Sequence, residues 1–120
     1  MKKLVDRGTL YNDEMSTFHT VARVEDIPEG QGRLFVVGGR MIGVFRSGGA
    51  YFAMDNRCPH EEAPLSRGRV EGGVVTCAMH HWRFRLCDGA WLDRDNPAYN
   101  AITFPVRIEG DQIQVGLPDP

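Results

Sequence analysis

Two short motifs, Cys58-x-His60 and Cys77-x-x-His80, each place one thiol and one imidazole close together along the chain. Thiolates and neutral imidazoles are protein ligands of zinc and of iron–sulfur clusters. Each motif lies on a turn at the end of an expected strand, so the two turns together offer two cysteines and two histidines. A two-iron cluster can divide this set by type, with both cysteines on one iron and both histidines on the other. Zinc is the alternative, although its paired ligands usually stand two to four residues apart, and Cys58-x-His60 is tighter than that.

Two residues close to these motifs are not expected to be ligands. His81 follows His80 directly, but only His80 keeps the C-x-x-H spacing. We therefore expect His81 to face outward, either as a plain surface side chain or as a contact to a redox partner. Cys87 stands beside a glycine turn and is expected to be a free thiol. A disulfide framework is not expected, because the cysteines number three and no secretory signal is visible, which indicates the reducing cytoplasm.

The segments around the motifs are typical of short strands separated by glycine turns. The strands are expected at residues 18–24, 34–37, 41–45, 51–54, 74–76, 81–86, 101–108 and 112–117. Gly38-Gly39 favours a hairpin, because glycine accepts positive φ without a steric penalty. Pro105 lies within an expected strand, where it indicates a sheet edge or a bulge. No window of eleven or more residues shows a helical apolar stripe, so the sequence predicts an all-β fold.

Length and composition indicate one soluble domain. The chain has 120 residues, of which 42% are hydrophobic and 25% charged, as is usual for a globular domain. Residues 1–15 are polar and without a clear period, so we expect a disordered or detachable extension before a domain over residues 16–120. The formal net charge of −2 argues against nucleic acid as a main partner. No apolar run approaches the roughly 20 residues that a membrane span needs, so no membrane association is expected.

The residues that flank both motifs resemble those of Rieske [2Fe–2S] proteins. Residues 58–68 (CPHEEAPLSRG) resemble the first cluster loop of Rieske ferredoxins, and residues 70–77 (VEGGVVTC) resemble the strand that enters the second. The similarity covers about residues 18–117. It implies one [2Fe–2S] cluster per chain, held by Cys58, His60, Cys77 and His80. It also implies the Rieske fold, an antiparallel β-sandwich of short strands with a small cluster-binding subdomain at about residues 55–90.

High-potential Rieske proteins of respiratory complexes carry four extra side chains near the cluster, and this chain lacks all four. Two are cysteines that bridge the ligand loops, and their positions fall at Ala63 and Met79. The others are a serine and a tyrosine that donate hydrogen bonds, and their positions fall at Trp82 and Phe84. Hydrogen bonds to sulfur stabilise the more negative, reduced cluster. The resemblance therefore implies a reduction potential near the low end of the Rieske range, around −150 mV.

The resemblance also implies a one-electron carrier and not an enzyme. The sequence shows no Gly-rich nucleotide loop, no mononuclear iron triad and no supported nucleophile–base pair. Rieske ferredoxins pass electrons from a flavin-dependent NAD(P)H reductase to a terminal oxygenase. Most Rieske proteins have glycine where this chain has His81. In this departure the chain resembles the ferredoxins of di-iron aromatic monooxygenases, such as toluene monooxygenases. The ferredoxins of ring-hydroxylating dioxygenases resemble it almost as well.

A second interpretation is the small Rieske subunit of an assimilatory NAD(P)H nitrite reductase. Such a protein would be a permanent, non-catalytic enzyme subunit, whereas the carrier is expected to be a monomer with weak and transient contacts. For the carrier, Glu61 and Glu62 directly after His60 are candidates for negative charge at the docking site. Residues 93–97, which end on a proline, are a candidate for a loop that covers the cluster.

Overall fold

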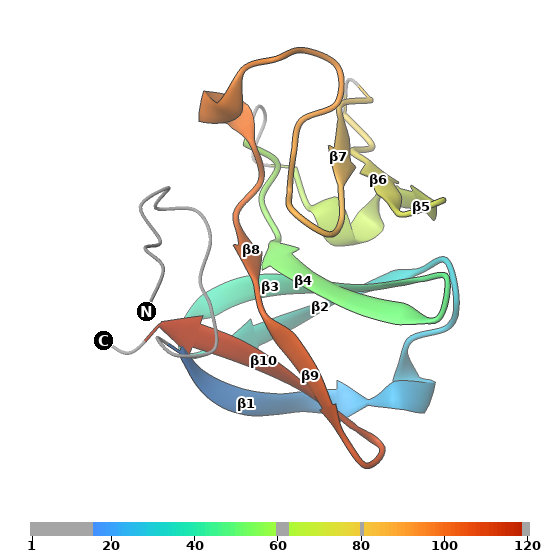
Figure 1. Ribbon diagram of the computed structural model, residues 1–120, viewed down its shortest axis with the longest axis vertical. Coiled ribbons are helices and arrows are strands. Elements are labelled where there is room, and N and C mark those ends of the chain that lie inside the picture. The colour runs from blue at the N-terminus through green and yellow to red at the C-terminus, as the bar shows by residue number, and fades with distance from the viewer. Residues whose placement is uncertain (1–15, 60–62, 80, 119–120) are drawn as a thin grey trace, which may run out of the picture.

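The computed structural model describes residues 16–59, 63–79 and 81–118. Within them every regular element is a strand or a short 3₁₀ helix (Figure 1). The strands are β1 (Ser16–Arg23), β2 (Gly32–Val37), β3 (Arg40–Ser47), β4 (Ala50–Asp55), β5 (Arg69–Glu71), β6 (Val74–Thr76), β7 (Arg83–Arg85), β8 (Thr103–Phe104), β9 (Val106–Glu109) and β10 (Gln112–Pro118). The 3₁₀ helices are η2 (Val24–Asp26), η3 (Leu65–Arg67) and η4 (Pro97–Tyr99). In this part of the chain no helix has the length and hydropathy to cross a bilayer.

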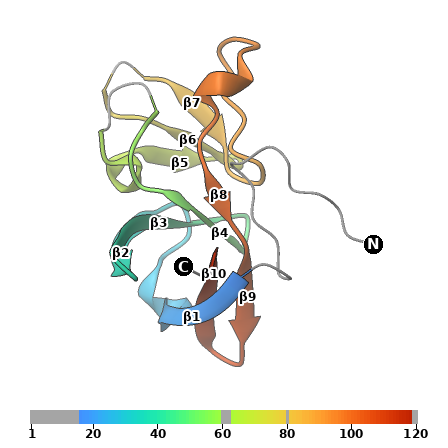
Figure 2. The ribbon, with the colours of Figure 1, turned by 90° about the vertical axis from the view of Figure 1, so that its left-hand side faces the viewer.

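Two antiparallel sheets form the larger part of the molecule, which we call the base. One sheet has the strand order β1-β10-β9 and the other has the order β2-β3-β4-β8. Both sheets contribute to one buried cluster, with Val44 from β3 and Val115 from β10 among its members. The two layers are visible in Figures 1 and 2. The predicted antiparallel β-sandwich is therefore confirmed.

A glycine turn joins β2 to β3, as the sequence predicts. Gly38 and Gly39 have φ angles of 57° and 80°, in the left-handed region where a β-carbon is disfavoured. The flanking residues Val37 and Arg40 pair directly, and the register continues along both strands. The turn residues thus set which side chains of β3 face the core of the base.

Pro105 lies between two strands, directly after β8 and directly before β9. We expected a single strand over residues 101–108, and this expectation is wrong. Thr103 and Phe104 form β8, which pairs with β4, whereas β9 starts at Val106 and pairs with β10 in the other sheet. Proline has no N–H to donate to a ladder, and its carbonyl accepts a hydrogen bond from the Gly116 N–H at 2.9 Å. The chain crosses between the two sheets at this residue.

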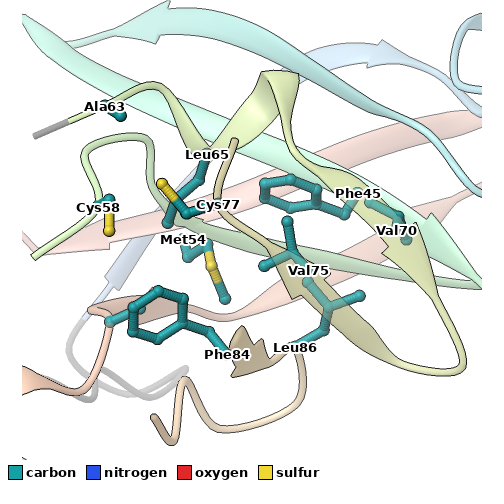
Figure 3. Close-up of a cluster of buried hydrophobic side chains, with 11 residues drawn as sticks. Phe45, Met54, Cys58, Ala63, Leu65, Val70, Val75, Cys77, Phe84 and Leu86 are labelled. Atoms are coloured by element: carbon teal, nitrogen blue, oxygen red, sulfur yellow. The ribbon is translucent and has the colours of Figure 1, made fainter. Parts of the chain in front are cut away.

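The chain leaves the base after β4 and returns to it at β8, and we call residues 56–102 between them the tip. Its sheet has the order β5-β6-β7, with three residues in each strand. Val70, Val75 and Phe84 are paired across this sheet and are all buried. They belong to a second buried cluster, drawn in Figure 3, to which β3 and β4 of the base also contribute side chains. The strand expected at residues 81–86 is shorter than predicted, although Phe84 and Leu86 are buried.

Candidate metal centre

Cys58 and Cys77 are both completely buried, and neither forms a disulfide. They belong to the buried cluster of the tip, and Figure 3 shows them at the same end of that cluster, one from each of two loops. The other members of the cluster are apolar. Two thiol sulfur atoms from separate loops in such a setting are suited to a soft metal centre.

The two cysteines start loops that are closed in the same way. The Cys58 N–H donates to the Ala63 carbonyl at 2.8 Å, and the Cys77 N–H donates to the Trp82 carbonyl at 2.7 Å. Each loop therefore spans six residues from the cysteine to its hydrogen-bond acceptor. The predicted ligands His60 and His80 fall inside these two loops, but they lie outside the described residues, as do Glu61 and Glu62.

Asn56 fixes the first loop to the base and to η3. It is 2% exposed, and its N–H donates to the Met41 carbonyl at 2.9 Å. Its carbonyl accepts from the Leu65 N–H at 2.6 Å, and its side-chain Oδ1 accepts from the Ser66 N–H at 2.9 Å. A buried amide with all these partners costs little to bury and strongly restricts both ends of the loop. Sequence reasoning missed Asn56, and its position two residues before Cys58 was the only available signal.

The second loop is held by the segment that follows β7. Asp93 accepts from the Arg83 N–H at 2.9 Å and from its guanidinium Nε at 3.0 Å. Burial raises the pKa of Asp93, but these hydrogen bonds from Arg83 outweigh it and hold the pKa below its ordinary value. Trp82 stacks on Trp91 with ring centroids 3.9 Å apart. The loop thus ends on an aromatic pair and an ion pair, both beyond the ligand motif itself.

His81 is exposed and has a φ of 60°, the one positive φ among the described residues that are not glycine. This conformation explains the glycine that most Rieske proteins have here, because only glycine adopts it without cost. Histidine is among the side chains that tolerate the left-handed region better than most. The expectation that His81 faces outward is confirmed.

The residues at the four high-potential positions have no hydroxyl or thiol group. Ala63 is buried and Met79 is about half exposed, so no disulfide links the two loops. Phe84 is fully buried in the same cluster as the thiols, and Trp82 packs partly buried against this cluster. A [2Fe–2S] group fits this donor set, with two buried thiols in apolar surroundings and one histidine in each loop sequence. The apolar surroundings also favour a low reduction potential.

Two other expectations concern the edges of the site. Cys87 is an exposed free thiol in a turn, as predicted. The segment that follows residues 93–97 lies beside the first ligand loop, because Ala98 and Asn100 line a hollow of about 260 Å³ together with Cys58 and Pro59. This hollow places η4 and the residues after it at the same end of the tip as the thiols.

The comparisons with known proteins agree with this geometry. A sequence profile of the Rieske [2Fe-2S] domain matches residues 17–105. The ferredoxin component of the naphthalene 1,2-dioxygenase system of Pseudomonas aeruginosa is 35% identical over 92 residues, which are 77% of this chain and 88% of that protein. The ferredoxin component of the alkene monooxygenase system of Xanthobacter autotrophicus is 32% identical over 98 residues, 80% of this chain and 78% of that protein.

Solved structures show the same fold. The ferredoxin of carbazole 1,9a-dioxygenase from Nocardioides aromaticivorans has a TM-score of 0.73 and 28% identity, and the match covers 87% of this chain and 100% of that one. A Mycobacterium tuberculosis protein described as a candidate NADH-dependent nitrite reductase small subunit has a TM-score of 0.79 and 25% identity, covering 88% and 98% of the two chains. The chain belongs to the Rieske [2Fe–2S] family and is a non-catalytic electron carrier of the ferredoxin kind.

Proposed function

We propose that this chain is the ferredoxin component of a multicomponent oxygenase. In this role it receives electrons one at a time from a flavin-dependent NAD(P)H reductase and passes them to a terminal oxygenase that acts on an aromatic or alkene substrate. The observation that carries the proposal is the pair of matched loops, each starting at a buried cysteine that is in no disulfide and each containing one histidine of the motif. The ferredoxin components among its relatives, from both oxygenase classes, support it.

We assign Cys58 and Cys77 to one iron and His60 and His80 to the other. The [2Fe–2S] cluster supplies reversible one-electron oxidation and reduction when it is bound. The chain's own residues bury the thiols and anchor the loops: Phe84 packs in the buried cluster that contains the thiols, Asn56 anchors the first loop, and the Trp82–Trp91 stack anchors the second. Loops that are anchored at their ends suit a carrier, because small changes of ligand position between oxidation states keep the reorganisation energy of electron transfer low.

The oxygenase is the partner that the comparisons support best. One solved structure is a complex of reduced oxygenase and oxidized ferredoxin in carbazole 1,9a-dioxygenase, and this chain matches it with a TM-score of 0.74 and 26% identity. A contact of this kind is expected to be small, below about 1,200 Å², because transient redox contacts lie at the low end of interface sizes. We propose in addition that the chain works in the cytoplasm as a monomer and that its reductase is a separate flavoprotein.

A second candidate function is the small subunit of a nitrite reductase. It is favoured by the structural match to the Mycobacterium tuberculosis protein, which covers 98% of that chain with a TM-score of 0.79. In that case the partner would be a large subunit that stays bound, and no free carrier would be found in the cell.

Reconstitution separates the two functions. The holoprotein is mixed with NADH, a flavoprotein reductase and the oxygenase of a naphthalene 1,2-dioxygenase or alkene monooxygenase system, and product formation is followed with and without the chain. We expect turnover that depends on the chain and saturates with its concentration, while gel filtration shows no stable complex. A stoichiometric complex with a large sirohaem protein, together with no stimulation of any oxygenase, would contradict the oxygenase role and support a subunit of nitrite reductase.

A further inference from the structure

The outer face of the tip sheet presents charged side chains, in contrast to its buried inner face. Arg69 of β5 and Arg83 of β7 both pair with Thr76, which lies between them in β6. These three residues alternate with the buried residues of the same strands, so their side chains lie on the outer face. Two guanidinium groups therefore stand in one row across the sheet.

This face is hollowed into a groove of about 680 Å³. Its lining includes Arg67, Arg69 and Arg83 against a single carboxylate, Glu71. With histidine neutral, the charged lining adds up to +2, in a chain whose formal net charge is −2. The groove is thus a positively charged region on a molecule whose net charge is negative. At short range its positive potential would attract negative charge on a neighbouring protein.

The cationic groove, defined by Arg67, Arg69 and Arg83, reaches the second ligand loop. Cys77 and His81 line it together with the arginines. A partner that fills the groove would therefore lie against the loop that contains the proposed ligand His80. Short distance between redox centres is the main requirement for electron transfer, so the position of the groove suits docking.

The arginines at the open side of the groove are available to a partner. Arg67 and Arg69 are exposed. The Arg69 guanidinium lies 3.4 Å from the Glu71 carboxylate, and these side chains are 79% and 77% exposed. An ion pair this exposed to water contributes little to the stability of the fold. Arg83 is different, because its guanidinium holds Asp93 at 3.0 Å. The first two arginines can therefore change partners at little cost.

The composition of this region is typical of a protein interface. Ala78 lines the groove, and Met79, the next residue along the chain, is 49% exposed, which offers an apolar contact next to the groove lining. Methionine and arginine are enriched in interfaces, whereas lysine is depleted. Within residues 16–118 every basic side chain other than histidine is arginine, since Lys2 and Lys3 are the two lysines of the chain.

The opposite end of the molecule is acidic on balance, although Arg23 lies 3.6 Å from Glu25 and 3.7 Å from Asp111 there. Glu25 and Asp26 of η2 lie next to the β9–β10 turn, where Asp111 accepts a hydrogen bond from the Val24 N–H at 2.8 Å. Glu109 stands at the same turn, at the far end of the long axis from the tip in Figure 1. An acidic partner would repel this end and attract the groove, which turns the tip toward the partner before contact.

We propose that the cationic groove beside the second ligand loop, and not the acidic pair Glu61 and Glu62 of the first, is the docking site for an acidic surface patch on the terminal oxygenase. The inference rests on the proposed function for the identity of the partner. The charge steers the encounter, and the exposed Met79 next to the groove lining offers an apolar contact. Arg67 and Arg69 thus act in recognition, whereas Arg83 keeps its structural pair with Asp93.

The test compares three double variants in electron transfer to an oxygenase that the wild-type protein reduces. Arg67→Gln/Arg69→Gln removes the two available charges. Arg67→Lys/Arg69→Lys keeps them, and Arg33→Gln/Arg40→Gln makes the same change in net charge on the β2–β3 hairpin of the base. The reduced proteins are mixed with the oxygenase in a stopped-flow instrument at several salt concentrations. Visible spectra and reduction potentials are recorded as a check that the site is intact.

We expect Arg67→Gln/Arg69→Gln to slow the second-order reaction about five-fold or more at low salt, because steering is the main effect of exposed interface charges. The difference should shrink toward 0.15 M salt, where charges are screened over about 8 Å. The lysine variant should keep most of the rate, and the hairpin variant should match wild type. Equal rates for the groove and hairpin variants would overturn the proposal.

A small-ion measurement keeps this result separate from the proposed function. Each reduced protein gives one electron to ferricyanide, which becomes ferrocyanide, or to the cation hexaammineruthenium(III). Arg67→Gln/Arg69→Gln should slow the reaction with the anion and speed the reaction with the cation, while the hairpin variant changes both less. If no oxygenase accepts electrons from the wild-type protein, the proposed function fails. The reactions with the small ions still measure the effect of the groove charges on electron transfer. Equal effects of both double variants on the small ions would show that the groove does not govern approach to the site.

Discussion

The base and the tip are built on different scales. In the base, β1 and β3 have eight residues each and β10 has seven. Long antiparallel ladders join β1 to β10 and β3 to its neighbours β2 and β4. In the tip, β5, β6 and β7 have three residues each, so each ladder contributes few hydrogen bonds. Small antiparallel sheets of this size are marginal without further packing. The tip must therefore gain its order from something besides its strands.

The two buried clusters differ in the same sense. The cluster of the base consists of aliphatic and aromatic side chains from both of its sheets. The cluster of the tip includes the thiols of Cys58 and Cys77, and Phe45 and Met54 of the base also belong to it. A bound metal centre joins loops that are distant in sequence, and its binding free energy becomes folding free energy. The comparison indicates that the base can fold by packing, whereas the tip depends on its cofactor.

The largest expected effect is the loss of one thiol ligand. Cys58→Ala should abolish the visible spectrum and the bound iron, because three remaining ligands cannot complete the centre. Amide hydrogen exchange should then accelerate strongly in the tip and much less in β3 and β10 of the base. Cys87→Ser is the control, and it should leave the spectrum and the reduction potential unchanged. Equal loss of protection in both regions would mean that the base also needs the cofactor.

Core truncation sharpens the comparison next. Phe84→Ala in the tip and Phe104→Ala in the base each remove a buried ring, which costs about 3–5 kcal/mol of unfolding free energy. Only the tip variant should also release iron faster to a chelator, because Phe84 packs in the cluster that contains both thiols. Denaturant unfolding and the rate of iron loss measure the two effects. Faster iron loss from Phe104→Ala would contradict the division into two regions.

The sequence predicts the long strands of the base and β6 of the tip, whereas β5 and the break at Pro105 are missed. Alternation is visible over segments such as residues 112–117, which lie within β10, but Arg69–Glu71 is too short to show any pattern and was not expected as a strand. The break at Pro105 was also missed, because a crossover and a bulge look alike along one chain. Short segments carry little local information about structure.

Some features of the metal site could be predicted from the sequence and others could not. The two cysteines and the outward position of His81 follow from spacing and motif, which are local. Contacts that depend on chain segments far apart could not be predicted, among them the Trp82–Trp91 stack and the Asn56 hydrogen bonds. The row of Arg69 and Arg83 across Thr76 depends on strand register, which the pattern of a three-residue strand does not determine.

The reduction potential tests the apolar character of the tip. We expect a value near −150 mV, at the low end of the Rieske range. Phe84→Tyr should raise it, because a hydroxyl near the site can donate a hydrogen bond that stabilises the reduced form. A hydrogen bond of roughly 1 kcal/mol corresponds to about 40 mV for one electron. Protein-film voltammetry measures both values, and a wild-type potential above about +100 mV, within the wider Rieske range, would refute the argument.

The smallest effect is expected in the base, at the turn between β3 and β4. The Glu29 carboxylate accepts hydrogen bonds from the Gly49 and Gly48 N–H groups, which lower its pKa from the ordinary value of 4.5. A lowered pKa in the folded state stabilises the fold above pH 4.5, and this contribution is lost as the pH falls through the lowered pKa.

Glu29→Gln should therefore lower the melting temperature at neutral pH and converge with wild type in acid, while the visible spectrum of the tip stays the same. Thermal melts across a pH series check this. A difference in melting temperature that persists at pH 2–3, well below the ordinary pKa of a glutamate, would show that the charge of Glu29 is not the cause.

Pulsed EPR of the reduced protein with ¹⁵N-labelled histidine tests the central claim most directly. Two imidazole nitrogen couplings are expected, from His60 and His80, in a protein with about two irons and two sulfides per chain. Both couplings should remain in His81→Gly, since glycine suits the φ of 60° at that residue. A colourless protein with one zinc, or a reduced centre without histidine nitrogen couplings, would contradict the account.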